Sequence, residues 1–187
     1  IDGFKIHIEK DAFIGAGFRN EISQSNFSTI VGGERNEIGR TRVDQSDKLT
    51  LAASHRNIPS ASAIVGGRFN KILDSGYSMI GGGRSNLIST GSNWSFIGAG
   101  LNNSIQDTSS YSVIAGGRYN AINNYSEFST ILGGASNYIG TGSHPADFDR
   151  TERSQFSVIA GGGSNVIVKS GYSAILGGTL CKITSSH

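Results

Sequence analysis

One short pattern returns along most of the chain, and it constrains the fold more than any other feature. It is seen in "FSTIVGGERNEI" (27–38), "YSVIAGGRYNAI" (111–122) and "FSTILGGASNYI" (128–139). The consensus is aromatic-Ser-x-Ile-x-Gly-Gly-x-x-Asn-x-Ile. Its serine recurs at Ser28, Ser62, Ser78, Ser95, Ser112, Ser129, Ser157 and Ser173, and its asparagine at Asn20, Asn36, Asn70, Asn86, Asn103, Asn120, Asn137 and Asn165. From Asn70 to Asn137 the successive steps are 16, 17, 17 and 17 residues.

Three further segments extend the repeat with substitutions at its marker positions. A weaker copy, "LTLAASHRNI" (49–58), fills the gap between Asn36 and Asn70. The first copy has Ala12 in place of the serine, and the last has Cys181 in place of the asparagine. Counted in this way, the chain holds ten copies.

The period predicts an all-β fold, a parallel β-helix or β-roll of about ten coils with 16–17 residues each. It is too short for a helix pair or a propeller blade, but it suits one coil of a solenoid. Segments such as "STIV" and "SAIL" have the β-branched and apolar residues of strands. We expect the Gly-Gly pair to form a corner and the asparagine to occupy a left-handed turn position. Ten coils at about 4.8 Å each would stand roughly 48 Å tall.

Strand alternation indicates that both faces of the repeated strand are apolar. Ser28 and Ile30 share one face, whereas Phe27 and Val31 lie on the other. The interior of a coil covers only one of these faces, and a monomer would expose the other as a continuous stripe. Burying both faces inside a wider monomeric solenoid is disfavoured, because 16 residues enclose too little space. We therefore expect copies of the same chain to cover the stripe, packed or intertwined as a homotrimer around one axis.

Composition excludes several other classes. The 27 glycines accompany only two prolines, which argues against collagen. The net charge of +2 without a basic run gives no indication of nucleic-acid binding, and the absence of about 18 consecutive apolar residues argues against membrane insertion. The single cysteine, Cys181, has no intrachain disulfide partner. Because the chain begins at Ile1 without a signal-peptide pattern, we expect one repeat domain (1–187) that is a piece of a longer protein.

Serial "S-x-I-x-G-G-x-x-N-x-I" copies, from about Asp11 to Ile183, resemble the glycine-rich repeats of viral tail fibres and spikes. More loosely, they are similar to the β-roll heads of trimeric autotransporter adhesins, although the period here is longer than the roughly 14-residue repeat of those heads. The resemblance implies a trimeric rod on a virion surface or a cell surface. It implies little about chemistry, since such repeats carry many functions.

Two insertions interrupt the repeat, at 39–48 and 140–155, and insertions in repeat proteins often form the binding face. A tolerated surface loop is an equally good interpretation, because lengthening a loop costs little. Paired carboxylates could act on a glycosidic bond, and His144 with Asp147 could bind a metal or move a proton. Neighbouring arginines favour a solvated ion-pair cluster instead, so we predict no catalytic residue, metal or cofactor. The candidate ligand-binding residues of the second insertion are His144, Asp147, Asp149, Arg150, Glu152 and Arg153.

A second candidate binding feature is a basic stripe. Arg68, Arg84 and Arg118 share the position after the Gly-Gly pair and form a candidate site for an acidic polysaccharide. Glu34 and Ala135 occupy the same position in other copies, so the stripe is interrupted. The repeated serines are read as buried hydrogen-bonding rows, because a catalytic serine would occur once with a histidine partner.

Two functions fit these observations. The first is a structural and adhesive module of a virion spike, tail fibre or cell-surface fibre, which presents its loops to a host cell-surface polysaccharide. The alternative is a polysaccharide-degrading spike, a lyase or a glycoside hydrolase, on the same trimeric rod. An enzyme needs a compact group of titrating residues with an orienting partner, and only the 140–155 insertion approaches that.

Overall fold

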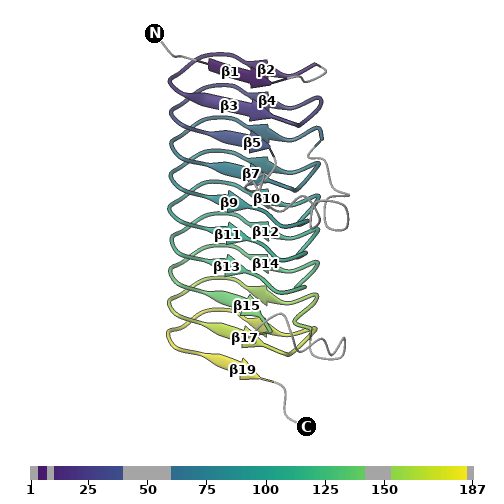
Figure 1. Cartoon of the computed structure of the whole chain (residues 1–187). Coiled ribbons are helices and arrows are strands. Elements are labelled where there is room, and N and C mark those ends of the chain that lie inside the picture. Colours follow the sequence, from purple (N-terminus) through teal and green to yellow (C-terminus); the bar gives the residue numbers. More distant parts are fainter. Residues whose placement is uncertain (1–3, 8–10, 40–59, 142–152, 185–187) are drawn as a thin grey trace, which may run out of the picture.

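The structure is a computed structural model that describes residues 4–7, 11–39, 60–141 and 153–184. Within these ranges the chain forms short strands and turns and no helix, and therefore no helix that could cross a membrane. The strands build two parallel sheets, one of ten strands and one of nine, and each repeat contributes one strand to each sheet. The result is the β-solenoid that the repeat predicts (Figure 1).

The two sheets contain alternate strands of the chain. The ten-stranded sheet holds, in spatial order, β1 (Phe4–His7), β3 (Asn20–Ser23), β5 (Glu37–Gly39), β7 (Lys71–Leu73), β9 (Leu87–Ile88), β11 (Ser104–Ile105), β13 (Ala121–Ile122), β15 (Tyr138–Gly140), β17 (Val166–Val168) and β19 (Lys182–Thr184). The nine-stranded sheet holds β2 (Phe13–Ile14), β4 (Thr29–Ile30), β6 (Ala63–Ile64), β8 (Met79–Ile80), β10 (Phe96–Ile97), β12 (Val113–Ile114), β14 (Thr130–Ile131), β16 (Val158–Ile159) and β18 (Ala174–Ile175).

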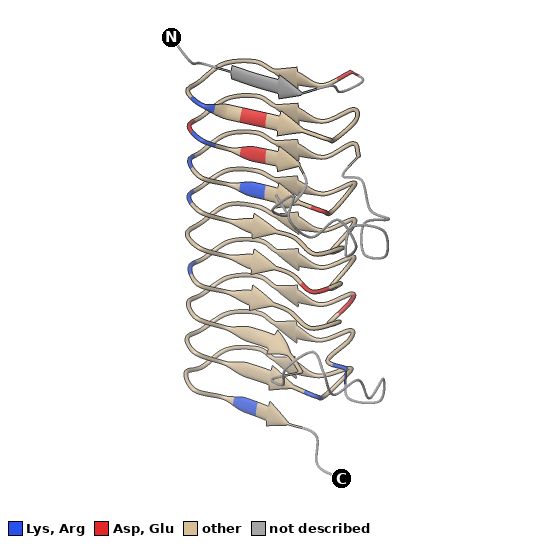
Figure 2. Cartoon of the chain, viewed as in Figure 1, with Lys and Arg blue, Asp and Glu red and all other residues tan. Residues whose placement is uncertain are grey.

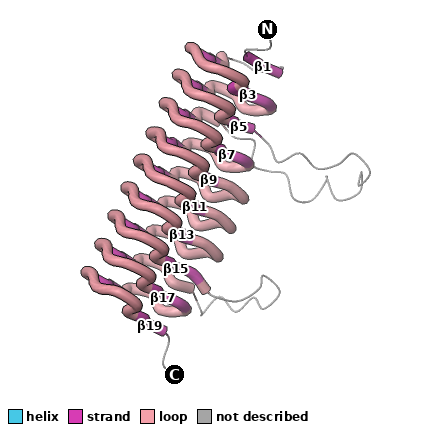
Figure 3. Tube along the Cα trace, turned by 90° about the vertical axis from the view of Figure 1, so that its left-hand side faces the viewer, coloured by secondary structure: helices cyan, strands magenta, loops and turns pink. Residues whose placement is uncertain are grey.

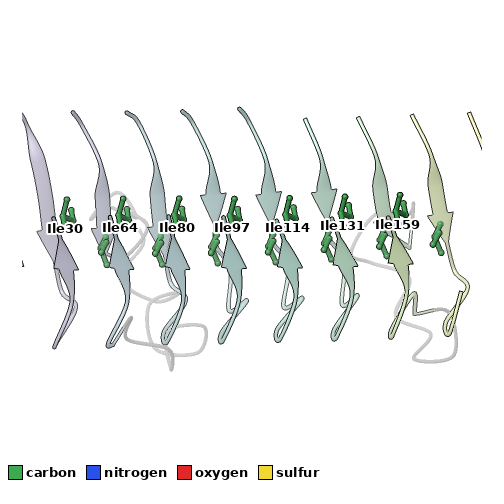
Figure 4. Packing of buried hydrophobic residues seen from close by; sticks show 14 of the residues in the cluster. Ile30, Ile64, Ile80, Ile97, Ile114, Ile131 and Ile159 are labelled. Atoms are coloured by element: carbon green, nitrogen blue, oxygen red, sulfur yellow. The ribbon is translucent and has the colours of Figure 1, made fainter. Parts of the chain in front are cut away.

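The interior between the sheets is built from isoleucine. Equivalent residues pair in register, so Ile97 lies between Ile80 and Ile114, and the side chains form a row along the solenoid (Figure 4). A second row comes from the ten-stranded sheet, where Ile105 pairs with Ile122. These side chains are fully buried along almost the whole length. The prediction that one apolar face of the repeated strand fills the interior of the coil is therefore confirmed.

Rows of polar side chains run along two sides of the isoleucine core. Each repeat asparagine is fully buried, and its Nδ2 donates to the carbonyl four residues earlier and to a carbonyl of the next coil; Asn120, for example, donates to Gly116 at 3.0 Å and to Gly134 at 3.1 Å. The repeat serine accepts a hydrogen bond from the main-chain N–H of the next one, as Ser112 does from Ser129 at 3.2 Å. Buried backbone groups at the corners are thereby satisfied by side chains.

A second serine ladder lies three residues before the first. Ser92 accepts a hydrogen bond from the main-chain N–H of Ser109, and Ser109 accepts one from Ser126, both at 3.1 Å. The sequence analysis missed this ladder. Its signal is a Ser-x-x-Ser spacing, present wherever a repeat serine is preceded three residues earlier by another serine, as in Ser109 and Ser112.

The Gly-Gly pair forms the expected corner, and its second glycine makes the turn. The second glycine of each pair, not the first, has a positive φ, +92° at Gly117, and a Cβ there would collide with the main-chain oxygen of Gly134. A Cβ on Gly116 would meet only the oxygen of Ala99, at 3.8 Å. The asparagine is likewise not left-handed, because the residue before it, such as Tyr119 with φ of 57°, makes that turn.

No coil lies at the place in the stack where the repeat count put the weak copy at 49–58. Ile30 pairs directly with Ile64, and the main-chain N–H of Asn70 donates to Oδ1 of Asn36 at 3.0 Å. The coils on either side of the gap are thus hydrogen-bonded to each other and leave no room for another. Residues 49–58 themselves lie outside the described residues.

Two edges connect the sheets, and the coils stack in a nearly straight column (Figure 3). The chain passes from the nine-stranded to the ten-stranded sheet through the Gly-Gly corner, which we call the glycine edge. It returns through the segment that begins at residues such as Asp74, and we call this side the insertion edge. Both insertions branch from it, after Gly39 at the end of β5 and after Gly140 at the end of β15.

Candidate interaction surfaces

A column of stacked aromatic rings lies where the insertion edge meets the nine-stranded sheet. Trp94 stacks between Tyr77 and Tyr111, with ring centroids 5.3 and 5.1 Å apart and the planes within 4°. The stack continues from Tyr111 through Phe128 and Phe156 to Tyr172. Neighbouring rings cover both faces of each inner ring, so the column presents ring edges to its surroundings.

These aromatic residues adopt a backbone conformation that bulky side chains rarely take. Their φ angles are positive, 52° at Trp94 and 57° at Tyr111. Such a conformation costs roughly 1–3 kcal/mol for a residue that is not glycine, asparagine or aspartate. Large rings at strained positions indicate that the rings have a role that glycine or asparagine would not fill.

The column forms one border of an exposed apolar face. This face, the outer side of the nine-stranded sheet together with the column, includes Phe13, Phe27, Val31, Val65, Tyr77, Met79, Trp94, Phe96, Tyr111, Phe128, Leu132, Phe156, Tyr172 and Leu176, all of them exposed. Eight ladder steps separate Phe13 from Ala174, about 38 Å at about 4.8 Å per step, and the outward residues span about 13 Å across. The flat area is roughly 500 Å², near the upper limit for a monomer.

The opposite sheet offers no comparable surface. Its outward residues run from Glu21 and Glu37 through Lys71 and Ser104 to Lys182, so charged and polar side chains interrupt it. Lys71 pairs with Glu37 at 2.7 Å. The largest group of exposed hydrophobic residues therefore lies on the nine-stranded sheet and its aromatic column, as the alternation of the repeated strand predicts, whereas Phe18, Tyr119 and Leu180 are exposed on the glycine edge.

Arginines gather on the glycine edge. Arg68 and Arg84 are bridged neighbours, and Leu101 separates Arg84 from Arg118; all three arginines are exposed. Arg68 pairs with Glu34 at 3.2 Å and lies over the ring of Phe69 at 4.8 Å. Two further arginines, Arg19 and Arg35, lie on the same edge one position later in their repeats. The predicted stripe is thus present but broken by Leu101, and Glu34 is the one acidic residue described on this edge.

Acidic residues gather on the insertion edge (Figure 2). Asp74 and Asp107 are equivalent residues at the left-handed turn that follows β7 and β11, with φ of 51° and 55°. Burial raises the pKa of the Asp107 carboxyl. Glu127, nearer the aromatic column, pairs with Arg153 at 3.7 Å. This segregation of charge was not predicted from the sequence, although the clustering of arginines after the Gly-Gly pair was a signal.

The candidate residues of the second insertion are only partly described. Arg153 is half-buried and lies over the ring of Tyr125 at 5.4 Å, besides pairing with Glu127. His144, Asp147, Asp149, Arg150 and Glu152 lie outside the described residues. Within the described ranges, no group of three or more His, Cys, Asp or Glu residues could hold a metal ion.

The ends of the second insertion meet in the solenoid. The Ser154 hydroxyl donates to the main-chain oxygen of Gly140 at 2.8 Å, as the Ser126 hydroxyl donates to Asn123 at the same distance in an uninterrupted coil. The coil is therefore closed by its own hydrogen bonds across the insertion.

Comparison with known proteins adds no family assignment. No protein-family model matches the chain, and no curated protein sequence shows a significant similarity to it.

Proposed function

We propose that this chain is a structural rod module that assembles with copies of itself through its apolar face, as a homotrimer in a virion spike, tail fibre or cell-surface fibre. One observation carries the proposal: an apolar face about 38 Å long remains exposed on a coil whose interior is already filled with isoleucine. An exposed apolar patch of this extent is often an interaction site.

The aromatic column favours a protein partner over a sugar. Sugar rings stack on open aromatic faces, whereas both faces of Trp94 are covered by Tyr77 and Tyr111. The exposed ring edges fit against apolar side chains or against other rings in edge-to-face contact. Copies of the same chain supply such a surface along the whole rod.

The experiment is a measurement of particle mass. Sedimentation equilibrium or multi-angle light scattering at micromolar concentration should give three chains per particle. A monodisperse monomer would refute self-association, and a stable dimer would refute the three-fold arrangement while retaining the role of the apolar face.

Adhesion is the second part of the proposal, and the position of the insertions supports it. Both branch from the same edge of the solenoid, after the equivalent residues Gly39 and Gly140, and neither interrupts the ladders. Loops held by a rigid scaffold commonly carry binding residues. The proposed ligand is a host cell-surface polysaccharide, with retention on immobilised acidic and neutral polysaccharides as the test.

A further inference from the structure

We infer that the copies in the assembly run parallel, with the arginine-bearing glycine edge of each chain facing the acidic insertion edge of the next. This inference rests on the proposed self-association through the apolar face. It adds the relative direction of the chains and the contact that determines it. The partner is a second copy of this chain.

Symmetry relates the edges of neighbouring copies in one of two ways. When apolar faces meet around an axis along the rod, the glycine edge of one copy comes next to the insertion edge of its neighbour. When they meet around an axis across the rod, the copies run antiparallel and like edges come together. A three-fold axis permits only the first arrangement, but a pair of copies could bury the same apolar residues in either one, so the charges on the edges distinguish the two.

The two edges differ in the sign of their charge. The described part of the glycine edge carries Arg19, Arg35, Arg68, Arg84 and Arg118 against Glu34. The described part of the insertion edge carries Asp11, Asp74, Asp107 and Glu127 against Arg153 and Lys169. Parallel copies therefore bring opposite charges together, and antiparallel copies bring arginine to arginine. Complementary charge selects the orientation of an interface even where it adds little affinity.

The charges of the two edges also correspond in their height along the rod. Asp74 belongs to the same coil as Arg68, since β7 follows that arginine directly. Asp107 belongs to the coil of Leu101, which lies between Arg84 and Arg118. Unshifted parallel copies thus place Asp107 level with the gap between two arginines of the neighbour. The partial burial of the Asp107 carboxylate makes a facing cation favourable there.

Energy transfer between labelled chains tests the direction. Glu21→Cys and Lys182→Cys, each in a Cys181→Ser background, place labels at opposite ends of the outer ten-stranded sheet, away from the apolar face. Eight ladder steps, about 38 Å, separate the two positions. Parallel copies give stronger transfer between two Glu21→Cys chains than between a Glu21→Cys and a Lys182→Cys chain. The reverse order overturns the inference and the three-fold arrangement but leaves self-association through the apolar face intact. No transfer in either mixture, with a monomeric mass, refutes self-association as well.

Charge reversal tests the contact itself. Arg84→Glu combined with Arg118→Glu should weaken assembly about tenfold or more at low salt, and by less at high salt, where screening is stronger. Adding Asp107→Lys should restore much of the loss, because opposite charges then face each other again. Lys182→Glu is the matched control, since it reverses one charge on the outer face of β19. Equal weakening by the control, or no recovery with Asp107→Lys, would overturn the inference.

Discussion

The main-chain N–H of Asn137 donates a hydrogen bond to the side-chain oxygen of Asn120 at 3.0 Å, and both residues are fully buried. The Asn120 amide in turn donates to the main-chain oxygen of Gly116 at 3.0 Å. One side chain thus satisfies backbone groups of two successive coils. The same arrangement recurs along the rod, which explains why the repeat retains an asparagine between the glycine corner and the strand.

Asn120→Ala should therefore destabilise the solenoid strongly. It leaves the N–H of Asn137 and the carbonyl of Gly116 buried without this partner, at a cost of roughly 2–5 kcal/mol. Chemical denaturation followed by circular dichroism measures the loss. Ser104→Ala, on the outer side of the neighbouring coil, should change the free energy of unfolding by less than about 0.5 kcal/mol. Equal effects of the two variants would contradict the role given to the ladder.

The glycine pair offers a matched test of the corner. Gly117→Ala should destabilise the fold by about 2 kcal/mol or more, because its φ of +92° is strained for alanine and its Cβ would collide with Gly134. Gly116→Ala should cost much less, since its Cβ has space beside Ala99. Comparing the two melting temperatures decides the matter, and a larger loss for Gly116→Ala would reverse the assignment.

Some features of this fold can be predicted from the sequence, because they leave a repeated pattern of residues in it. The period and the alternation of Ser112, Val113 and Ile114 are enough to predict parallel coils with isoleucine inside. The choice of the second glycine is not predictable in the same way. Both glycines recur together, and only the approach of the next coil to Gly117 separates them.

The candidate interaction surfaces are less predictable from the sequence. The repeated residues indicate how the solenoid is built, but the residues that differ between repeats carry no such signal. The left-handed turn at Trp94 leaves no propensity signal, since aromatic residues disfavour it; tertiary stacking overrides the local preference. Asp74 and Asp107 are single acids among variable residues, and their common edge becomes visible only once the coils are aligned in space.

Disruption of the second serine ladder should destabilise the fold less than Asn120→Ala does. Ser109→Ala removes the acceptor for the main-chain N–H of Ser126, and an unpaired buried N–H costs about 1–3 kcal/mol. Denaturant titration should show this loss without a change in oligomeric state. Unchanged stability would indicate that another group accepts the bond from Ser126.

Loss of one ring from the aromatic column should weaken self-association without unfolding the chain. Trp94→Asn keeps a residue that tolerates the left-handed backbone but removes the ring from the middle of the apolar face. The coil should remain folded, and self-association should weaken at least about tenfold, as central aromatic residues often dominate interfaces. Sedimentation and circular dichroism measured together distinguish the two effects.

Tyr119→Asn is the control for this variant. Tyr119 is as exposed as Trp94, 53% against 50%, and has a similar φ of 57°, but it lies on the glycine edge. Its replacement should leave the mass of the particle unchanged. If both variants dissociate the assembly alike, the apolar face does not determine self-association.

Removal of the second insertion should abolish adhesion without disturbing the solenoid. Replacing residues 141–153 with Asn-Tyr makes the segment from Gly140 to Ser154 match the uninterrupted turn from Asn123 to Ser126. Because Ser154 already bonds to Gly140 across the insertion, the shortened chain should keep its fold and oligomeric state. Loss of Arg153 removes only a surface pair with Glu127, worth about 1 kcal/mol or less.

Polysaccharide binding, measured on a glycan array beside the full chain, should be lost from the shortened chain. The enzymatic alternative makes the same prediction for turnover, which a reducing-end assay and ultraviolet absorbance detect on the same polysaccharides. Binding retained at full strength would move the ligand site away from this insertion. The variant Arg84→Ala with Arg118→Ala would then show whether the ligand occupies the glycine edge, since a polyanion that follows the arginines should lose affinity and salt dependence together.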